Sequence, residues 1–342
     1  MENMLYLFIG STALSKAPGI SAAGANPDVT PYTAPVDADL IRFGHSRVFK
    51  GIPVDPQGHP TPAIITRAAV LEAGIPVTAV QAGSWIAPSP PYVETGALPA
   101  GDPRLGPAVP DAAEIMESAA ELARNAATGT WKRPFVMVAE SVPGGTTTAL
   151  LVLRALGYRE MVSSAGPENP VNLKEAVWAE ASRRLGIGIG GLADAPLRAI
   201  SELGDPMQAA VTGFVTALPP ETELVLAGGT QMLAVAALLR ALGRRGGAPG
   251  KLPLVATTKY VQCDRNADFT ALSRSIGVET WAAPLDFSNS PHRGLAGYEN
   301  GYVKEGAGAG GSVYYAERLG VAAERVMERT KALYREMMNE KA

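Results

Sequence analysis

Short apolar runs alternate along the chain with longer segments whose apolar residues recur at helical spacing. The short runs predict strands at residues 4–9, 75–80, 135–140, 223–227, 252–257 and 278–285. The longer segments predict helices at residues 61–73, 111–126, 172–185, 230–243 and 267–276, a helix ending at Gly157, a helix beginning at Pro206 and a long helix closing the chain. Strands and helices in this rhythm predict an α/β protein with a parallel sheet and helices on both faces.

A glycine turn follows the strand predicted at residues 135–140. It reads Glu140-Ser141-Val142-Pro143-Gly144-Gly145-Thr146-Thr147-Thr148 and opens the helix that ends at Gly157. Glycines let backbone N–H groups approach a ligand, and hydroxyls at a helix start add donors where the helix dipole favours an anion. The turn is therefore either a phosphate site or a tight turn in which threonine only caps the helix. It is not a Walker A loop, because no lysine lies between Arg133 and Arg154.

The same plan occurs a second time. The apolar run at residues 223–227 leads into Gly228-Gly229-Thr230, and the following apolar helix stops at Gly243 in the same Leu-Arg-Ala-Leu-Gly sequence that stops the first. Two such units predict neighbouring parallel strands that bring both Gly-Gly-Thr turns to one carboxyl edge. That edge is where open α/β sheets bind ligands.

Two glutamates are candidates for chemistry. Glu305 lies in Lys304-Glu305-Gly306-Ala307-Gly308-Ala309-Gly310-Gly311, where the glycines suggest backbone pressed against a ligand. A carboxyl group there would have a raised pKa and accept a proton near neutral pH, unless it only caps the helix that follows. Glu140, at the end of its strand, either hydrogen-bonds ribose hydroxyls or caps the Gly-Gly-Thr turn. The residues themselves leave both pairs of alternatives open.

Composition and charge exclude several classes of function. Of the 342 residues, 46% are hydrophobic and the net charge is −3, so the chain can bury a large core but has no basic surface for nucleic acid or an anionic membrane. Aromatic residues make up 6%, which argues against a base-stacking platform. No apolar stretch approaches the ~18 residues of a membrane span, and the N-terminus lacks the basic segment of a signal peptide.

Cysteine and histidine usage indicates neither metal nor redox chemistry. The single cysteine, Cys263, excludes an internal disulfide, and we interpret it as a buried small residue and not a nucleophile. This usage fits a reducing cytoplasm. His45, His59 and His292 are far apart, lack metal-ligand spacing and are expected in surface or loop positions, so we expect no metal and no cofactor.

Two other stretches are less specific. Residues 87–110 contain seven prolines and predict a long irregular loop, which is either one wall of a pocket or a linker crossing the surface. Residues 186–191 read Gly-Ile-Gly-Ile-Gly-Gly but follow a predicted helix and not a strand, so they are a weak dinucleotide motif.

Three motifs in this order resemble the nicotinate-nucleotide dimethylbenzimidazole phosphoribosyltransferase family, in a divergent branch. They are residues 140–148, the sequence Ala227-Gly228-Gly229-Thr230-Gln231-Met232, and residues 303–311. Residues 19–25 and 204–207 extend the similarity over most of the chain. The resemblance implies a homodimer with a Rossmann-like parallel sheet and a smaller helical domain. We expect the smaller domain at residues 1–110 and 312–342 and the α/β substrate-binding domain at residues 111–311.

The resemblance also implies the chemistry. The phosphoribosyl group of nicotinate mononucleotide passes to a nitrogen of 5,6-dimethylbenzimidazole or a related base such as a purine, which forms α-ribazole phosphate for the lower ligand of cobalamin and releases nicotinate. Glu305 matches the family's catalytic glutamate, which takes the proton from the base, and Glu140 matches an acid of the donor loop. The other expected substrate-binding residues are Ser141, Gly144, Gly145, Thr146, Thr147, Gly228, Gly229, Thr230, Lys304 and Gly306.

An absence in the sequence agrees with such a donor. Enzymes that use phosphoribosyl pyrophosphate usually hold its magnesium with adjacent acidic residues, and this chain contains no adjacent acidic pair. A donor without pyrophosphate needs no metal clamp. The alternative from another class is a non-catalytic nucleotide-binding or regulatory protein. A kinase or synthetase is a third option, against which the missing phosphate-binding lysine argues.

Overall fold

The structure is a computed structural model, and it describes residues 3–21, 23–24, 26–51, 53–127, 135–243 and 252–339. Ala22 and Ala25, from the stretch at residues 19–25, lie outside the described residues.

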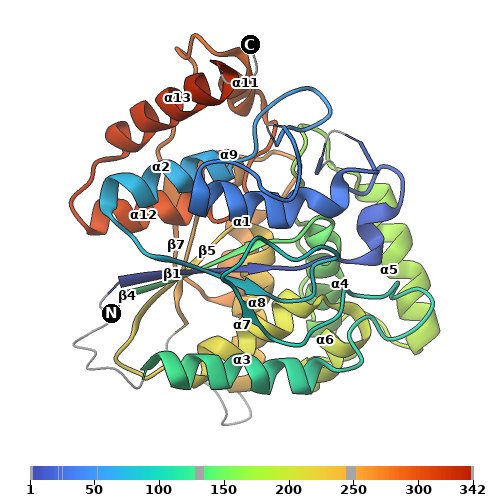
Figure 1. Cartoon of the computed structure of the whole chain (residues 1–342). Helices are drawn as coiled ribbons and strands as arrows, with labels where there is room; N and C mark the ends of the chain where they lie inside the picture. Colours follow the sequence, from blue (N-terminus) through green and yellow to red (C-terminus); the bar gives the residue numbers. More distant parts are fainter. Residues whose placement is uncertain are drawn as a thin grey trace.

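The described residues form one parallel sheet of seven strands, in the order β3-β2-β1-β4-β5-β6-β7 (Figure 1). The strands are β1 Asn3–Ile9, β2 Val77–Gln81, β3 Val93–Glu94, β4 Phe135–Ser141, β5 Glu223–Ala227, β6 Leu254–Thr258 and β7 Thr280–Ala283. All six predicted strands are confirmed, and the short β3 is the addition. The chain adds strands outward from β1 on one side and from β4 on the other, so the strand order reverses between these two neighbours.

Helices cover both faces of the sheet, which confirms the predicted fold class (Figure 1). One face carries helices from both ends of the chain: α1 Thr33–Phe43, α2 Ala63–Ala73, α12 Ala309–Arg318 and α13 Ala323–Asn339. The other face carries α3 Ala112–Ala127, α4 Gly145–Leu156, α5 Val171–Leu185, α6 Pro196–Leu203, α7 Pro206–Ala217, α8 Thr230–Gly243 and α10 Phe269–Ile276. The short helices α9 Lys259–Gln262 and α11 Arg293–Ala296 follow β6 and β7. Because β1 to β3 pair into the same sheet as β4 to β7, the sheet joins the two expected domains, and their division stays a prediction.

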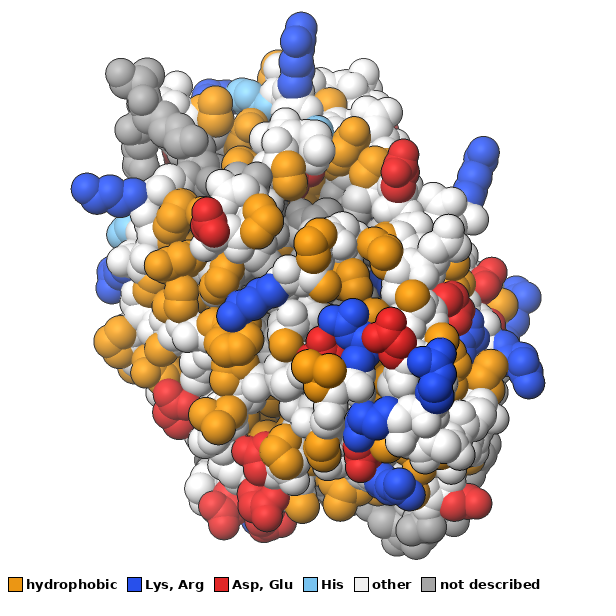
Figure 2. Space-filling model, turned by 90° about the vertical axis from the view of Figure 1, so that its right-hand side faces the viewer, with side chains coloured by type: hydrophobic (Ala, Val, Ile, Leu, Met, Phe, Trp, Pro, Cys, Tyr) orange, Lys and Arg blue, Asp and Glu red, His pale blue; other side chains and the backbone are white. Residues whose placement is uncertain are grey.

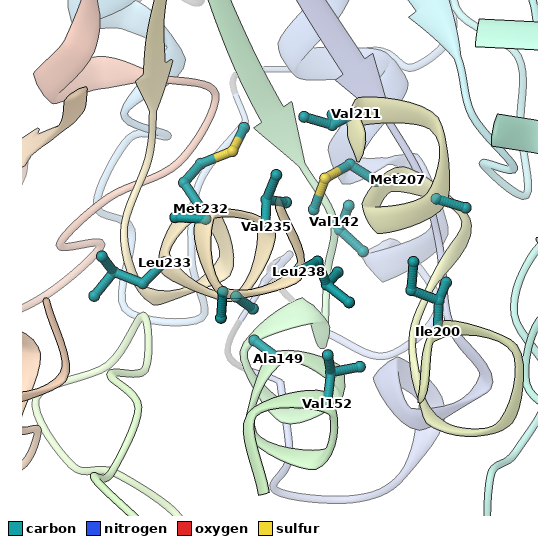
Figure 3. Packing of buried hydrophobic residues seen from close by; sticks show 14 of the residues in the cluster. Val142, Ala149, Val152, Ile200, Met207, Val211, Met232, Leu233, Val235 and Leu238 are labelled. Atoms are coloured by element: carbon teal, nitrogen blue, oxygen red, sulfur yellow. The ribbon is translucent and has the colours of Figure 1, made fainter. Parts of the chain in front are cut away.

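The central strands are buried on both sides. In β1, Tyr6 and Phe8 face the core beneath α3, α7 and α8, whereas Leu7 and Ile9 face the core beneath α1, α2 and α12. Strands that are covered on both faces appear in the sequence as continuous apolar runs. The short apolar runs therefore predicted the strands correctly. Figure 3 shows the first core, where Val142 and residues of α4, α6, α7 and α8 interdigitate.

Local signals fix several helix ends as predicted. Gly157 ends α4 with φ 109°, in the left-handed region that favours glycine. Asp205 accepts a hydrogen bond from the Gln208 backbone N–H at 3.0 Å, and Pro206 is the first residue of α7. The sequence patterns therefore determine these boundaries locally.

The sequence prediction missed helices α1 and α6 and the four-residue helices α9 and α11, and the single long helix expected after residue 311 is two helices, α12 and α13. The most important of the missed helices is α1. It starts in a proline-rich region, and Pro35 in its first turn is compatible with a helix because the missing N–H would have no partner there. Its buried side carries Asp37 and Asp39, so it lacks a clean apolar stripe. Helix α6 was missed for a different reason: its buried residues are all apolar, but the segment is only eight residues long and begins at Pro196.

The glycine run at residues 306–311 is pressed against the sheet. A Cβ on Gly310 would lie 1.9 Å from the carbonyl carbon of Thr257, and one on Gly311 would lie 2.2 Å from Cβ of Ala227. These glycines let α12 lie against β5 and β6. The expectation that these glycines press against a ligand was therefore wrong for Gly310 and Gly311, which press against the sheet. Gly306 is the glycine of the run that lines the cavity described below.

Candidate active site

A cavity of about 640 Å³ opens at the carboxyl edge of the sheet. It lies at the ends of β4 and β5, next to the point where the strand order reverses, which is where open α/β sheets bind ligands. Its volume falls in the range of small-molecule sites, roughly 300–1,000 Å³. Figure 2 looks onto the side of the molecule to which the carboxyl ends of the strands point, where apolar side chains are spread over the centre and charged ones gather to the lower right.

The structure brings most of the predicted site residues into this one cavity. Its lining includes Glu140, Ser141, Gly144, Gly145, Thr146, Gly229, Thr230, Lys304, Glu305 and Gly306. Both Gly-Gly-Thr turns and the Lys-Glu-Gly segment therefore meet, although the first turn and the last segment are far apart in the sequence. Residues 163–168 and the segment from Pro53 to Gln57 complete the walls together with α1.

Two predicted residues do not line the cavity. Thr147 is fully buried inside α4, and its hydroxyl has no hydrogen-bond partner among the described residues. Gly228 packs against the Glu140 side chain: a Cβ on Gly228 would lie 3.3 Å from Oε1 of Glu140. Thr148 also points away and donates to Asp205 Oδ2 at 2.5 Å. Of the three threonines expected to offer hydroxyls, Thr146 reaches the cavity.

Glu305 is held by four hydrogen bonds. Its Oε1 accepts from the backbone N–H of Gly306 at 3.2 Å and of Gly310 at 3.3 Å, and its Oε2 accepts from Gly310 at 3.3 Å and from the Thr257 hydroxyl at 3.2 Å. Burial raises the pKa of Glu305 to about 7, against the lowering effect of these donors. Gly310 lies in the first turn of α12, so the Glu305 carboxylate binds the N-terminus of this helix and also lines the cavity. Capping the helix is therefore compatible with a role as a general base.

The backbone around Glu305 is unusual. Val303 has φ 46° and Ala307 has φ 51°, left-handed conformations that non-glycine residues rarely adopt. Such strain concentrates at functional sites, where the surrounding structure holds it in place. The segment is fixed by the Lys304 N–H, which donates to Ala165 O, and by the Thr258 hydroxyl, which donates to Lys304 O.

Glu140 is 2% exposed, and its Oε2 accepts a hydrogen bond from Gln231 Nε2 at 2.9 Å. Burial raises its pKa well above the ordinary value, and the nearby carboxylates of Glu305, Asp205 and Asp37 raise it further. Gln231, which follows the second Gly-Gly-Thr turn directly, was quoted in the motif but not predicted as a site residue.

A buried ion pair lies next to Glu305 in the sequence. Lys304 Nζ pairs with Asp264 Oδ2 at 2.7 Å, and the Ser163 hydroxyl donates to the same oxygen at 2.8 Å. Lys174 is fully buried, and its Nζ donates to Ser163 O at 2.7 Å and to Asn169 Oδ1 at 2.9 Å. Burial, together with the charge of Lys304, lowers the pKa of Lys174 to about 7. Lys174 and Asp264 could not be found from the sequence, because no local pattern connects them to Lys304.

Asp37 is a third carboxylate on the cavity surface and comes from the unpredicted helix α1. Its Oδ1 accepts from the Thr61 hydroxyl and its Oδ2 from the Ser141 hydroxyl, both at 2.7 Å. Burial raises its pKa to about 6, although both hydroxyls lower it. Ser141, expected to bind substrate, thus also orients this acid.

Several other residues considered in the sequence analysis do not line the cavity. No residue of the proline-rich loop at 87–110 or of the glycine repeat at 186–191 lines it. Cys263 is exposed, so its interpretation as a buried residue was wrong. His59 pairs with Asp55 at 2.8 Å and stacks on Tyr302, two residues that do line the cavity. Within the described ranges, no group of three or more His, Cys, Asp or Glu side chains is arranged to hold a metal ion, and no helix is long and apolar enough to cross a membrane.

Curated relatives extend over the whole chain. The UPF0284 protein of Pyrococcus furiosus is 44% identical over 339 residues, which cover 99% of this chain and 100% of that protein. The UPF0284 protein of Thermococcus kodakarensis is 45% identical over 342 residues, with complete coverage of both. The chain belongs to the UPF0284 family. No protein-family model matches it.

Solved structures share the fold of this UPF0284 chain. The nicotinate-nucleotide-dimethylbenzimidazole phosphoribosyltransferase of Thermus thermophilus superposes with a TM-score of 0.59 at 17% identity, over 98% of this chain and 83% of that one. A second structure from the same organism, described as CobT, gives the same TM-score and identity over 98% and 84%. At this identity the likeness shows the fold. It confirms the resemblance found in the sequence at that level, and the separate family of the close relatives fits a divergent branch.

Proposed function

We propose that this UPF0284 protein is a phosphoribosyltransferase that moves the phosphoribosyl group of nicotinate mononucleotide to 5,6-dimethylbenzimidazole or a related base, for the lower ligand of cobalamin. The observation that carries the proposal is the meeting of Glu305 with both Gly-Gly-Thr turns in one cavity at the carboxyl edge. The shared fold with a solved phosphoribosyltransferase supports it.

Each Gly-Gly-Thr turn opens a helix, α4 for the first and α8 for the second, and residues of both turns line the cavity. A helix N-terminus favours an anion. The 5′-phosphate is therefore expected on one of the two turns. Ser163 N–H donates to Thr230 Oγ1 at the second turn.

In the proposed reaction, each of the two glutamates has a role. A lone pair on one ring nitrogen of the base forms the new bond to the ribose C1′, while the bond from C1′ to the pyridinium nitrogen breaks and its electrons return to the nicotinate ring. The proton on the other ring nitrogen of the base passes to Glu305, whose pKa of about 7 suits a general base at neutral pH. Glu140 is suited to hydrogen-bonding the ribose hydroxyls.

Nicotinate release tests the proposal directly. The protein is incubated with nicotinate mononucleotide and a panel of bases, comprising 5,6-dimethylbenzimidazole, benzimidazole and adenine, and nicotinate is measured chromatographically. We expect release that depends on a base, with a ribotide product of matching mass. Binding of nicotinate mononucleotide without release for any base would favour the alternative, a non-catalytic nucleotide-binding protein.

Two further properties belong to this proposal. The homodimer implied by the resemblance predicts a species of twice the 35.5 kDa chain mass in sedimentation. A cytoplasmic location is proposed with it, and fractionation of the source cells tests that part.

A further inference from the structure

Lys304 and Glu305 are neighbours in the sequence, but their side chains bind different parts of the molecule. The Glu305 carboxylate accepts hydrogen bonds from the Thr257 hydroxyl and from two backbone N–H groups. The Lys304 ammonium donates instead to Asp264 Oδ2 at 2.7 Å. The two side chains of this ion pair are 4% and 3% exposed. A buried ion pair therefore lies directly beside the proposed general base.

The ion pair connects the catalytic segment to one wall of the cavity. Asp264 Oδ2 also accepts from the Ser163 hydroxyl at 2.8 Å. The backbone N–H of Lys304 donates to Ala165 O at 3.4 Å. Ser163 and Ala165 line the cavity, and Ser163 N–H donates to Thr230 Oγ1 in the second Gly-Gly-Thr turn at 3.3 Å. Lys304 is thus bound to this wall through its backbone and its side chain, and the wall in turn contacts the second turn.

The backbone next to the ion pair is in an unfavourable conformation. Val303 has φ 46°, and such a conformation persists only where the surrounding contacts over-determine it. Three groups of Lys304 make these contacts: its N–H, its carbonyl oxygen, which accepts from the Thr258 hydroxyl, and its ammonium. Without the ion pair, the segment can relax and carry Glu305 with it.

The energetics of a buried ion pair favour a role in geometry over a role in stability. Desolvation of the two charges offsets much of their attraction, so replacing such a pair by neutral side chains of similar volume is often neutral for stability. Catalysis is more sensitive to position, because a misplacement of about 1 Å can lower a rate about 100-fold. A general base has to lie within about 2.6–3.2 Å of the atom from which it takes a proton.

We propose that Lys304 and Asp264 are positioning residues whose buried ion pair holds the Glu305 carboxylate where it takes the proton from the acceptor base. The inference rests on the proposed transfer and adds a positioning pair to it. Asp264 does not line the cavity, so it acts through Lys304 and Glu305 and not on a substrate.

Three variants of the full chain separate positioning from stability: Lys304→Met, Asp264→Asn and the double variant. Each single variant leaves one buried charge unpaired and should unfold at a lower urea concentration than the wild type. The double variant removes both charges, and the new amide oxygen can still accept from Asn266 N–H, which donates to Asp264 Oδ1 at 3.0 Å. The double variant should therefore recover most of the urea midpoint.

The kinetics of the double variant should not recover. We expect its kcat for nicotinate release to stay roughly 10- to 100-fold below the wild-type value, because Glu305 is displaced. Its affinity for nicotinate mononucleotide, measured by calorimetry, should stay within about threefold, since the loss is confined to the proton transfer. A pair with only a structural role would restore kcat together with stability.

Hydrogen exchange of the Gly310 amide reports the position of Glu305 without turnover. This N–H donates to both Glu305 oxygens and lies in the first turn of α12, where the backbone N–H groups have no intrahelical partner. We expect NMR to show exchange roughly tenfold faster in the double variant, the loss of about one hydrogen bond. The control Arg184→Met/Glu202→Gln removes an ion pair of 2.9 Å between residues that do not line the cavity, and should keep wild-type exchange and kcat.

The outcomes separate the inference from the proposed function. A wild-type kcat in the folded double variant would overturn the positioning role, and so would wild-type exchange at Gly310. Weaker binding of nicotinate mononucleotide with unchanged kcat would overturn it as well, because Lys304 would then be a substrate ligand. If the wild-type protein releases no nicotinate with any base, the proposed transfer fails, and the exchange of Gly310 decides the positioning role alone. Asp264→Asn gives the same comparison if the double variant does not fold.

Discussion

Gln231 Nε2 donates a hydrogen bond to Glu140 Oε2 at 2.9 Å and so joins the two Gly-Gly-Thr units. The same side chain lies over the first turn, because its Oε1 would be 1.7 Å from a Cβ built on Gly145. A residue with a Cβ at position 145 would therefore have to displace the amide of a side chain from the second unit. The two units, alike in sequence, make different contributions to one site.

Gly145→Ala is predicted to displace Gln231 and to leave Glu140 without its donor. Overpacking of this kind costs about 1–3 kcal/mol, and urea unfolding would measure it. We also expect weaker binding of nicotinate mononucleotide, because the wall beside Glu140 is rearranged. The double variant Gly145→Ala/Gln231→Ala removes the clash and should recover most of the unfolding free energy. If it is no more stable than Gly145→Ala, the contact with Gln231 does not explain the glycine.

Glu305→Gln is predicted to lower kcat by roughly 10²- to 10⁴-fold, the range for loss of a general base. Affinity for nicotinate mononucleotide, measured by calorimetry, should stay within about twofold, since the amide has nearly the same shape. In the wild-type enzyme, kcat should rise with pH through about 7 because the carboxylate is the form that accepts the proton. Unchanged turnover in the variant would reject the role given to Glu305.

Gly310→Ala is predicted to destabilise the fold by about 3 kcal/mol, because its Cβ would meet the Thr257 backbone, which cannot move aside. The control is Gly106→Ala, where the new methyl group would meet nothing within 4 Å and φ is not left-handed. The control should change the unfolding free energy by less than about 0.5 kcal/mol. Equal effects of the two substitutions would contradict the close approach of α12 to β6.

Asp205 is predicted to make stability fall as pH rises. Burial raises its pKa from 3.8 to about 6, so the folded state holds the proton more tightly than the unfolded state does. The contribution is fully present below about pH 4 and is lost between pH 4 and 6, with a magnitude of about 3 kcal/mol. Asp205→Asn keeps an N-cap residue on α7 and should reduce this decline in urea unfolding at about pH 4 to 7. An unchanged slope would exclude Asp205 as its source.

Much of the fold was predictable because its signals are local. The strands were readable because both faces of the sheet are covered, and Gly157 and Asp205 mark helix ends through their own backbone and side-chain chemistry. Helix α1 was missed because its buried face contains Asp37, whose partners Thr61 and Ser141 come from elsewhere in the chain. Cavity residues that belong to a sequence motif, such as Glu305, were predictable. A buried side chain that comes from a distant element, such as Lys174, was not.

The sequence by itself determined the alternation of strands and helices, the two glycine turns and the lone acid near the C-terminus, since each depends on neighbouring residues. Only the tertiary structure decided which hydroxyl, which glycine and which charge face the cavity. That choice depends on contacts between residues far apart in the chain, such as Gln231 with Gly145 and Lys304 with Asp264. Packing in three dimensions makes these contacts, and no local pattern encodes them.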